Sequence, residues 1–109
     1  GLTPVVIEDD AFIGAGSIIV EGIQVGSRAV IAPGVSLSKG VPVYDCVNEK
    51  VLEKGAPIPP NAVVVPGSRP INSQNPWAKE QGLALNCALI IKYRDEKSDT
   101  SLELESLLR

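Results

Sequence analysis

The sequence contains no histidine and no methionine, and its aromatic residues are one Trp, two Tyr and one Phe. Without histidine, this chain supplies no imidazole base, no Ser-His-Asp triad and no zinc-finger ligand set. We therefore expect no metal site, and any base that the chain provides must be a carboxylate. Otherwise the base comes from outside these 109 residues.

Long apolar runs and a secretory signal are also missing, which argues against a membrane span or an exported protein. The net charge is −3 with only ten Lys and Arg, which argues against nucleic acid as the main partner. Cys46 and Cys87 lie far apart without CxxC spacing, and we expect two reduced thiols in a cytoplasmic protein. The chain begins with Gly1 and fits one small domain, and we expect it to be part of a longer protein.

A branched aliphatic residue recurs at every sixth position along the first part of the chain. The column contains Ile7, Ile13, Ile19, Val25, Ile31, Leu37 and Val43. Three residues after each of the first six aliphatics, the residue is mostly glycine: Asp10, Gly16, Gly22, Arg28, Gly34 and Gly40. Four residues after each, the residue is small or β-branched: Ala11, Ser17, Ile23, Ala29, Val35 and Val41. A period of six indicates a short strand, a corner that favours positive φ, and another short strand. Three hexads make one triangular coil, so the pattern predicts an all-β fold built on a parallel β-helix.

Two coils, spanning 7–42, bury too little to be stable alone, so further coils or other subunits must cover their open end. The rhythm stops at Val43, and 44–57 is predicted to be a loop inserted into the coils. It resumes at Ile58, which gives a first region, 1–67, of β-helix coils. A second region, 68–109, is predicted to contain a loop, a strand and a short helix.

Proline, glycine, serine and asparagine predict a long loop over 66–82. Residues 83–94 alternate as a strand, which we place antiparallel to 62–66 as a hairpin extension. Thr100 and Glu103 have the spacing of a capping box, and Leu104, Leu107 and Leu108 share one face. These features predict a terminal helix with an apolar stripe that must dock on another surface.

The hexads resemble those of the hexapeptide-repeat acyltransferases, whose β-helix is left-handed. The left hand comes from this resemblance alone, because the general preference for right-handed crossovers predicts the opposite. Three stretches are more specific: VVIEDDAFIGAGSIIVEG, VYDCVNEKVLEKGAPIPPNAVVVPGS and NCALIIKYRDEKSDTSLELESLLR. Together they resemble the C-terminal half of the tetrahydrodipicolinate N-succinyltransferases.

This resemblance implies a transfer of succinyl from succinyl-CoA to the amine of the ring-opened substrate, 2-amino-6-oxopimelate, in lysine and diaminopimelate biosynthesis. It also implies a homotrimer with active sites in grooves between adjacent β-helices and with coenzyme A along the outside of the coils. The alternatives are the N-acetyltransferase of the same pathway or another CoA-dependent hexapeptide acyltransferase, and a non-catalytic β-helix trimerisation module. A γ-type carbonic anhydrase shares this fold, but it needs zinc-binding histidines and the chain has none.

The resemblance also indicates site residues. Many relatives carry a glutamate directly after the serine of the G-A-x-S motif, but this chain has Ile18 there, so Glu21 is the only candidate catalytic carboxylate. The candidates for contact with the cofactor are Gly16, Ser17, Gly34, Ser36, Lys39 and Arg69, of which the last two suit its phosphates. The alternative is that these residues are ordinary corners and solvated charges. Trp77 lies in a polar loop, where an indole seldom sits without a partner, and we expect it either to cover the groove or to pack at a subunit contact. The family's active-site aspartate and substrate-binding arginine belong to coils before Gly1, so the chain alone is expected to be inactive.

Overall fold

Six strands of two residues each form the first part of the structure, a computed structural model that describes residues 3–72 and 74–95. They are β1 (Val6–Ile7), β2 (Phe12–Ile13), β3 (Ile18–Ile19), β4 (Gln24–Val25), β5 (Val30–Ile31) and β6 (Ser36–Leu37). β1 pairs in parallel with β4, β2 with β5 and β3 with β6, and each pair joins residues that are 18 positions apart. One coil is therefore three hexads, as the period of six predicts.

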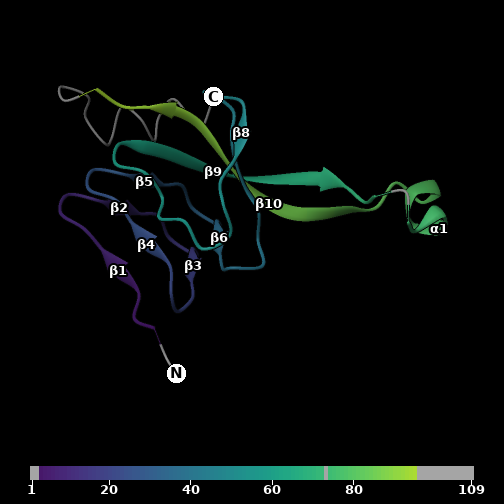
Figure 1. Cartoon of the computed structure of the whole chain (residues 1–109), viewed down its shortest axis with the longest axis horizontal. Coiled ribbons are helices and arrows are strands. Elements are labelled where there is room, and N and C mark those ends of the chain that lie inside the picture. Colours follow the sequence, from purple (N-terminus) through teal and green to yellow (C-terminus); the bar gives the residue numbers. More distant parts are fainter. Residues whose placement is uncertain (1–2, 73, 96–109) are drawn as a thin grey trace.

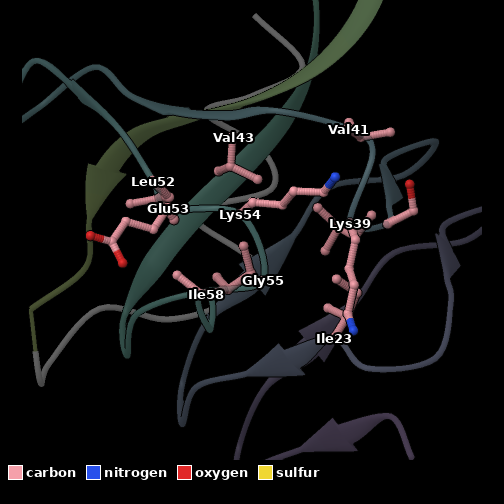
Figure 2. A pocket seen from close by; sticks show the side chains of 12 residues that line it. Ile23, Lys39, Val41, Val43, Leu52, Glu53, Lys54, Gly55 and Ile58 are labelled. Carbon is pink, nitrogen blue, oxygen red and sulfur yellow. The ribbon is translucent and has the colours of Figure 1, made fainter. Parts of the chain in front are cut away.

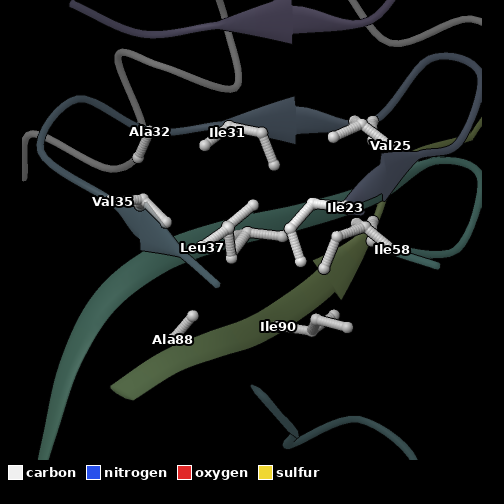
Figure 3. Packing of buried hydrophobic residues seen from close by; sticks show 12 residues of the cluster. Ile23, Val25, Ile31, Ala32, Val35, Leu37, Ile58, Ala88 and Ile90 are labelled. Carbon is white, nitrogen blue, oxygen red and sulfur yellow. The ribbon is translucent and has the colours of Figure 1, made fainter. Parts of the chain in front are cut away.

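The aliphatic column points into the coils, and its burial increases along the chain. Ile7 is 47% exposed at the open end, whereas Val25 and Ile31 are fully buried and Leu37 is 2% exposed. In Figure 3 the side chains of Val25, Ile31 and Leu37 point toward a shared interior. The second coil is covered on both sides and the first on one side only, which explains the difference.

The corners adopt the left-handed backbone conformation that the glycine-rich column predicts. Five of its six members have a positive φ: Asp10, Gly16, Gly22, Arg28 and Gly34. Gly40 is the exception. Arg28 holds this conformation, at φ 61°, without being glycine or an Asx residue. Such a backbone costs a residue with a Cβ roughly 1–2 kcal/mol, so contacts of the side chain must offset the strain.

The segment 44–57 is not a plain loop, which corrects the prediction. It contains most of β7 (Val43–Asp45) and all of β8 (Lys50–Val51), which pair antiparallel to each other. The coil then resumes as expected: Ile58 bridges Val25, and Val63 lies opposite Val30. The third coil thus contains the inserted hairpin, and its chain returns to register afterwards.

β9 (Ala62–Pro70) pairs antiparallel with β10 (Ala84–Tyr93), with Tyr93 opposite Ala62 and Ala84 opposite Pro70. The predicted antiparallel pairing of 83–94 with 62–66 is present, but the predicted loop over 66–82 is wrong for 66–70 and for 76–80. Residues 66–70 continue β9, and α1 (Pro76–Glu80) follows, with the Asn75 side chain accepting a hydrogen bond from the Ala78 N–H. Figure 1 shows β9 and β10 extending beyond the coils, with α1 at the far end of this two-stranded arm.

β10 also closes the core. The largest sheet has the strand order β2-β5-β9-β10-β7-β8, and Ala88 and Ile90 of β10 are fully buried against the coil interior. β9 continues straight as far as Pro70, and in the part of the chain that the structure describes β6 pairs with β3 alone, so no strand of the third coil lies under β6 there. Side chains of β10 fill this place. Among the described residues no helix is long and apolar enough to cross a membrane, and the helix expected at 100–109 lies outside them.

Candidate functional site

Gly16 and Gly34 lie at the same corner of successive coils, next to a hydrogen bond from the Gly34 N–H to the Ala15 carbonyl, 3.1 Å long. Their φ angles are 74° and 79°, and a Cβ on either would meet no atom within 4 Å. Both glycines are therefore required by the backbone conformation and leave bare main chain facing open space. This corner of the coils is open to a ligand that approaches the backbone.

The two candidate serines have different environments. The hydroxyl of Ser17 donates a 3.0 Å hydrogen bond to the carbonyl of Ala32 on the next coil, so it contributes to coil stacking. Ser36 lies on β6 opposite Ile18 of β3, and Ile18 is 59% exposed. The outer surface of this strand pair therefore presents an isoleucine beside a serine, with no carboxylate at the position of Ile18.

Glu21 and Lys39 are both exposed and occupy equivalent corner positions on successive coils, 18 residues apart in the register of β3 and β6. A Cβ on Gly22 would lie 2.9 Å from the Cε of Lys39, so the lysine side chain passes over the Gly22 corner. The lysine stem thus reaches back to the corner where Glu21 lies. Carboxylate and ammonium are presented on one edge of the coils.

Lys39 also borders a small pocket beside the inserted segment (Figure 2), together with Lys54, Glu53 and Gly55. The pocket encloses about 30 Å³, room for about one water molecule, and its floor is formed by Ile23 and Ile58. It is therefore too small to enclose a cofactor. Its two lysines give the rim a positive character at this edge of the coils.

Arg69 lies elsewhere, on the β9 part of the arm opposite Leu85. Its Nε is buried and has no hydrogen-bond partner among the described residues. Burial raises the pKa of the nearby Cys87 thiol, and the positive charge of Arg69 partly counteracts that shift. No described pocket contains both Arg69 and Lys39, so the structure does not bring the two predicted phosphate ligands together.

Asp45 forms a buried polar cluster that sequence reasoning missed. Its carboxylate is 1% exposed and accepts hydrogen bonds from the N–H groups of Val47 and Asn48, from the Asn48 side chain and from the Tyr93 hydroxyl at 2.7 Å. Burial opposes ionisation, but these hydrogen bonds outweigh it and lower the pKa of Asp45 to about 2. The cluster joins the inserted hairpin to β10 and is structural. The only sequence signal for it is the D-x-x-N spacing of a turn.

A second missed cluster lies at one corner of the coils. Asp10, Arg28 and Asn61 occupy equivalent positions in the strand register, and all three have positive φ. The Arg28 side chain donates to the Asn61 Oδ1 at 3.0 Å and to the Asp95 carbonyl at 2.7 Å, and Arg94 donates to the Arg28 carbonyl at 3.2 Å. These bonds tie the end of β10 to the coils. The break in the glycine column at Arg28 is the only sequence signal that marks this corner.

The coils, their corners and the aliphatic interior are typical of a β-helix built from hexapeptide repeats. Residues 4–39 match the family model described as the hexapeptide repeat of succinyl-transferase. This third of the chain is therefore similar to the hexapeptide repeats of succinyltransferases.

Among the most similar relatives, a protein of Wigglesworthia glossinidia brevipalpis named 2,3,4,5-tetrahydropyridine-2,6-dicarboxylate N-succinyltransferase is 40% identical over 96% of this chain and 35% of its own length. A protein of Pelagibacter ubique with the same name is 42% identical over 97% of the chain and 36% of its own length. Protein TabB of Pseudomonas amygdali pv. tabaci is 42% identical over 100% of the chain and 37% of its own length. The chain thus spans about a third of the length of the curated relatives that it matches.

Proposed function

We propose that this chain is the C-terminal part of a tetrahydrodipicolinate N-succinyltransferase, with the left-handed coil of that family. The enzyme transfers succinyl from succinyl-CoA to the amine of the ring-opened substrate, in the cytoplasm and in lysine and diaminopimelate biosynthesis. The observation that carries the proposal is the 40% identity, over 96% of the chain, to a relative with this activity in its name.

In this proposal the chain supplies one wall of the acyl-CoA groove. Stacked strands hold rows of backbone N–H and C=O groups rigidly, and rigid elements position a ligand better than loops do. The bare corner at Gly16 and Gly34 lets an extended amide chain approach the backbone without meeting a side chain. Ser36 lies on the neighbouring strand pair and borders the same groove.

The phosphates of the cofactor are proposed to lie at the edge where Lys39 and Lys54 border one pocket. Ammonium groups on flexible stems bind phosphate oxygens as point charges, and their contribution weakens as salt screens it. Lys54 joins the predicted Lys39 because the inserted hairpin brings it there. Arg69 lies on the arm and, in this proposal, contacts a cofactor only across a subunit boundary.

The proposal includes the homotrimer that the resemblance implies, and the small size of the pocket beside Lys39 is compatible with a groove shared between subunits. A space of about 30 Å³ does not enclose an acyl-CoA, and in this proposal a second surface completes the groove. A neighbouring coil supplies this surface in the proposed trimer. Glu21 is exposed and can face that groove as the carboxylate that accepts the amine proton.

Steady-state kinetics on the enzyme that contains this chain test the assignment. We expect kcat/KM with succinyl-CoA to exceed that with acetyl-CoA, because the family match is to succinyltransferases. A preference for acetyl-CoA would reassign the enzyme to the N-acetyltransferase of the pathway. If neither donor raises the thermal midpoint of the oligomer, the β-helix is a non-catalytic assembly module.

Three variants test the site within the proposal. Lys39→Ala and Lys54→Ala are each expected to raise KM for acyl-CoA several-fold, more strongly at low salt, whereas Lys50→Ala on β8 serves as the control. Glu21→Gln is expected to lower kcat and to change its pH profile. Unchanged turnover across pH would remove Glu21 from the reaction.

A further inference from the structure

The single tryptophan of the chain lies at the tip of the arm that β9 and β10 form. Trp77 is 66% exposed, more than any other large apolar side chain that the structure describes. Leu83 and Leu85 next to the tip are 47% and 41% exposed, so the ring is part of a wider apolar surface. Tryptophan is enriched at interfaces, because its ring is largely apolar and its N–H can still reach an acceptor there.

Local hydrogen bonds fix this tip in one arrangement. The Asn75 side chain accepts from the Ala78 N–H at the start of α1, and the Leu83 N–H donates a 3.0 Å hydrogen bond to the Ala78 carbonyl. Ala78 is 2% exposed, so this side of α1 is packed against the arm. Trp77 is therefore held on the open side of a helix that is fixed to the end of the arm.

The inserted hairpin of β7 and β8 carries a hollow that suits an aromatic ring. Its volume is about 370 Å³, its surface is mostly apolar, and it is lined by Tyr44, Asp45, Cys46, Glu49, Lys50 and Val51. Val51 is 55% exposed, and Cys46, in the turn after β7, is exposed as well. Apolar hollows of this kind are the places that aromatic anchor residues fill at protein interfaces.

The tip and the hollow of one chain cannot meet. Tyr44 lies opposite Leu89 of β10, and β10 begins five residues before Leu89, at Ala84. Five residues of strand span about 17 Å, and α1 lies beyond that end of the strand (Figure 1). The two strands of the arm stay paired as far as Ala84 and Pro70, so the arm does not fold back. A hollow that Trp77 fills has to belong to another molecule.

We propose that Trp77 docks into the hollow of the inserted hairpin of a second copy of this chain. The ring then packs against Tyr44 and Val51, and Glu49 on the same lining is an acceptor for the indole N–H. A tip on one copy and a hollow on the next make a head-to-tail contact, which gives a closed ring of copies when the rotation closes. The inference concerns assembly and does not depend on acyl transfer.

The charges of the two surfaces favour this contact over one between two arms. The hollow has a negative net charge, because its charged lining residues are two acids and one base: Asp45, Glu49 and Lys50. The arm residues 66–86 have a positive net charge from two bases and one acid: Arg69, Lys79 and Glu80. Opposite charges attract across an interface, whereas two copies of the same arm would bring like charges together.

A disulfide trap tests the proposal in the protein that contains this chain. With Cys87 replaced by alanine, Trp77→Cys places a thiol at the docking position, and Ser68→Cys places one on β9 of the same arm as the control. Under oxidised glutathione, Trp77→Cys is expected to bond to Cys46 of another copy at least ten times faster than Ser68→Cys does. Non-reducing gels detect the bond between chains, and peptide mass spectrometry identifies the two cysteines that it joins.

Alkylation of Cys46 gives a second measurement that needs no new cysteine. Trp77→Ala is expected to raise the rate of Cys46 alkylation about tenfold, because the docked ring covers this thiol, whereas Ser68→Ala leaves the rate unchanged. Circular dichroism checks that both variants remain folded. Bonds that join only two Trp77→Cys positions would show that the arms pair with each other. That result, equal rates for Trp77→Cys and Ser68→Cys, or an unchanged Cys46 rate in Trp77→Ala would overturn the proposal.

Discussion

Arg28 and Asn61 lie at the same corner of adjacent coils, and the Nε of Arg28 donates a 3.0 Å hydrogen bond to the Oδ1 of Asn61. Both residues have a left-handed backbone, with φ of 61° and 66°. The same guanidinium donates to the carbonyl of Asp95. One side chain therefore joins two coils and the end of the strand that closes the core.

Replacing Arg28 separates the hydrogen bonds from the backbone strain. Arg28→Ala loses both side-chain bonds and keeps the strain, so we expect the free energy of unfolding to fall by about 2 kcal/mol. Arg28→Gly also loses the bonds but relieves the strain, so its loss should be smaller by about 1 kcal/mol. Denaturant titration measures both values, and an equal loss in the two variants would show that the strain is negligible.

Acid stability should depend on Asp45. Its pKa is lowered to about 2 in the folded chain from 3.8, so its contribution is fully present above about pH 4 and is lost as the pH falls toward 2. The shift corresponds to about 2 kcal/mol. The free energy of unfolding, measured between pH 2 and 6, should therefore depend less steeply on pH in Asp45→Asn than in the unmodified chain. An unchanged slope would show that Asp45 is not ionised in the cluster.

The decrease of stability at alkaline pH should depend on Tyr93. Burial and the hydrogen bond to the Asp45 carboxylate raise the pKa of Tyr93 to about 12 from 10.0, so the neutral phenol is the favoured form. Its contribution is complete below about pH 10 and disappears as the pH rises toward 12. Tyr93→Phe should flatten the stability curve in that range, while Tyr44→Phe is the matched control. A curve that falls equally in both variants would contradict the role of Tyr93.

Two neighbouring glycines should respond differently to alanine. A Cβ on Gly14 would lie 2.4 Å from the backbone nitrogen of Pro33 on the next coil, so Gly14→Ala should cost about 3 kcal/mol through overpacking. Gly16→Ala meets open space and carries only the cost of positive φ, about 1 kcal/mol. Thermal and denaturant unfolding of the two variants measure the difference.

Gly16→Ala also tests whether the open corner receives the acyl donor. A methyl group there would obstruct a ligand that lies against the backbone, so KM for acyl-CoA should rise several-fold while kcat changes little. Lys50→Ala, on the inserted hairpin, provides a kinetic control. An unchanged KM would restrict Gly16 to a structural role.

Much of the coil was predictable because the conformation of each hexad depends mainly on its own residues. The aliphatic column, the corners at Gly16 and Gly34 and the resumption at Ile58 follow from a short-range repeat that the sequence displays directly. The errors fall on segments whose conformation depends on distant partners. Residues 66–70 have the composition of a loop, yet they form a strand because 84–88 pair with them.

The candidate site was predictable only in part, for the same reason. Lys39 stays a predicted phosphate ligand, chosen for its flexible ammonium group. That Lys54 borders the same pocket could not be predicted, since the inserted hairpin decides where that side chain lies. Asp45 is in a polar stretch that reads as exposed, and its burial depends on Tyr93, 48 positions away. In the sequence, Arg69 and Lys39 are both positive charges that suit a phosphate. In the structure they lie apart, because Arg69 is on the arm of β9 and Lys39 is on the coils.

The sequence by itself determined the six-residue period, the inward aliphatic column and the left-handed corners, because these depend on local sterics and on an apolar face that repeats with each turn of the coil. Only the tertiary structure decided that β10 closes the end of the coils, that Arg28 and Asp45 hold it there, and that Trp77 is exposed at the tip of the arm. Such features arise from pairing between distant segments, and the energy of that pairing depends on which groups are buried together.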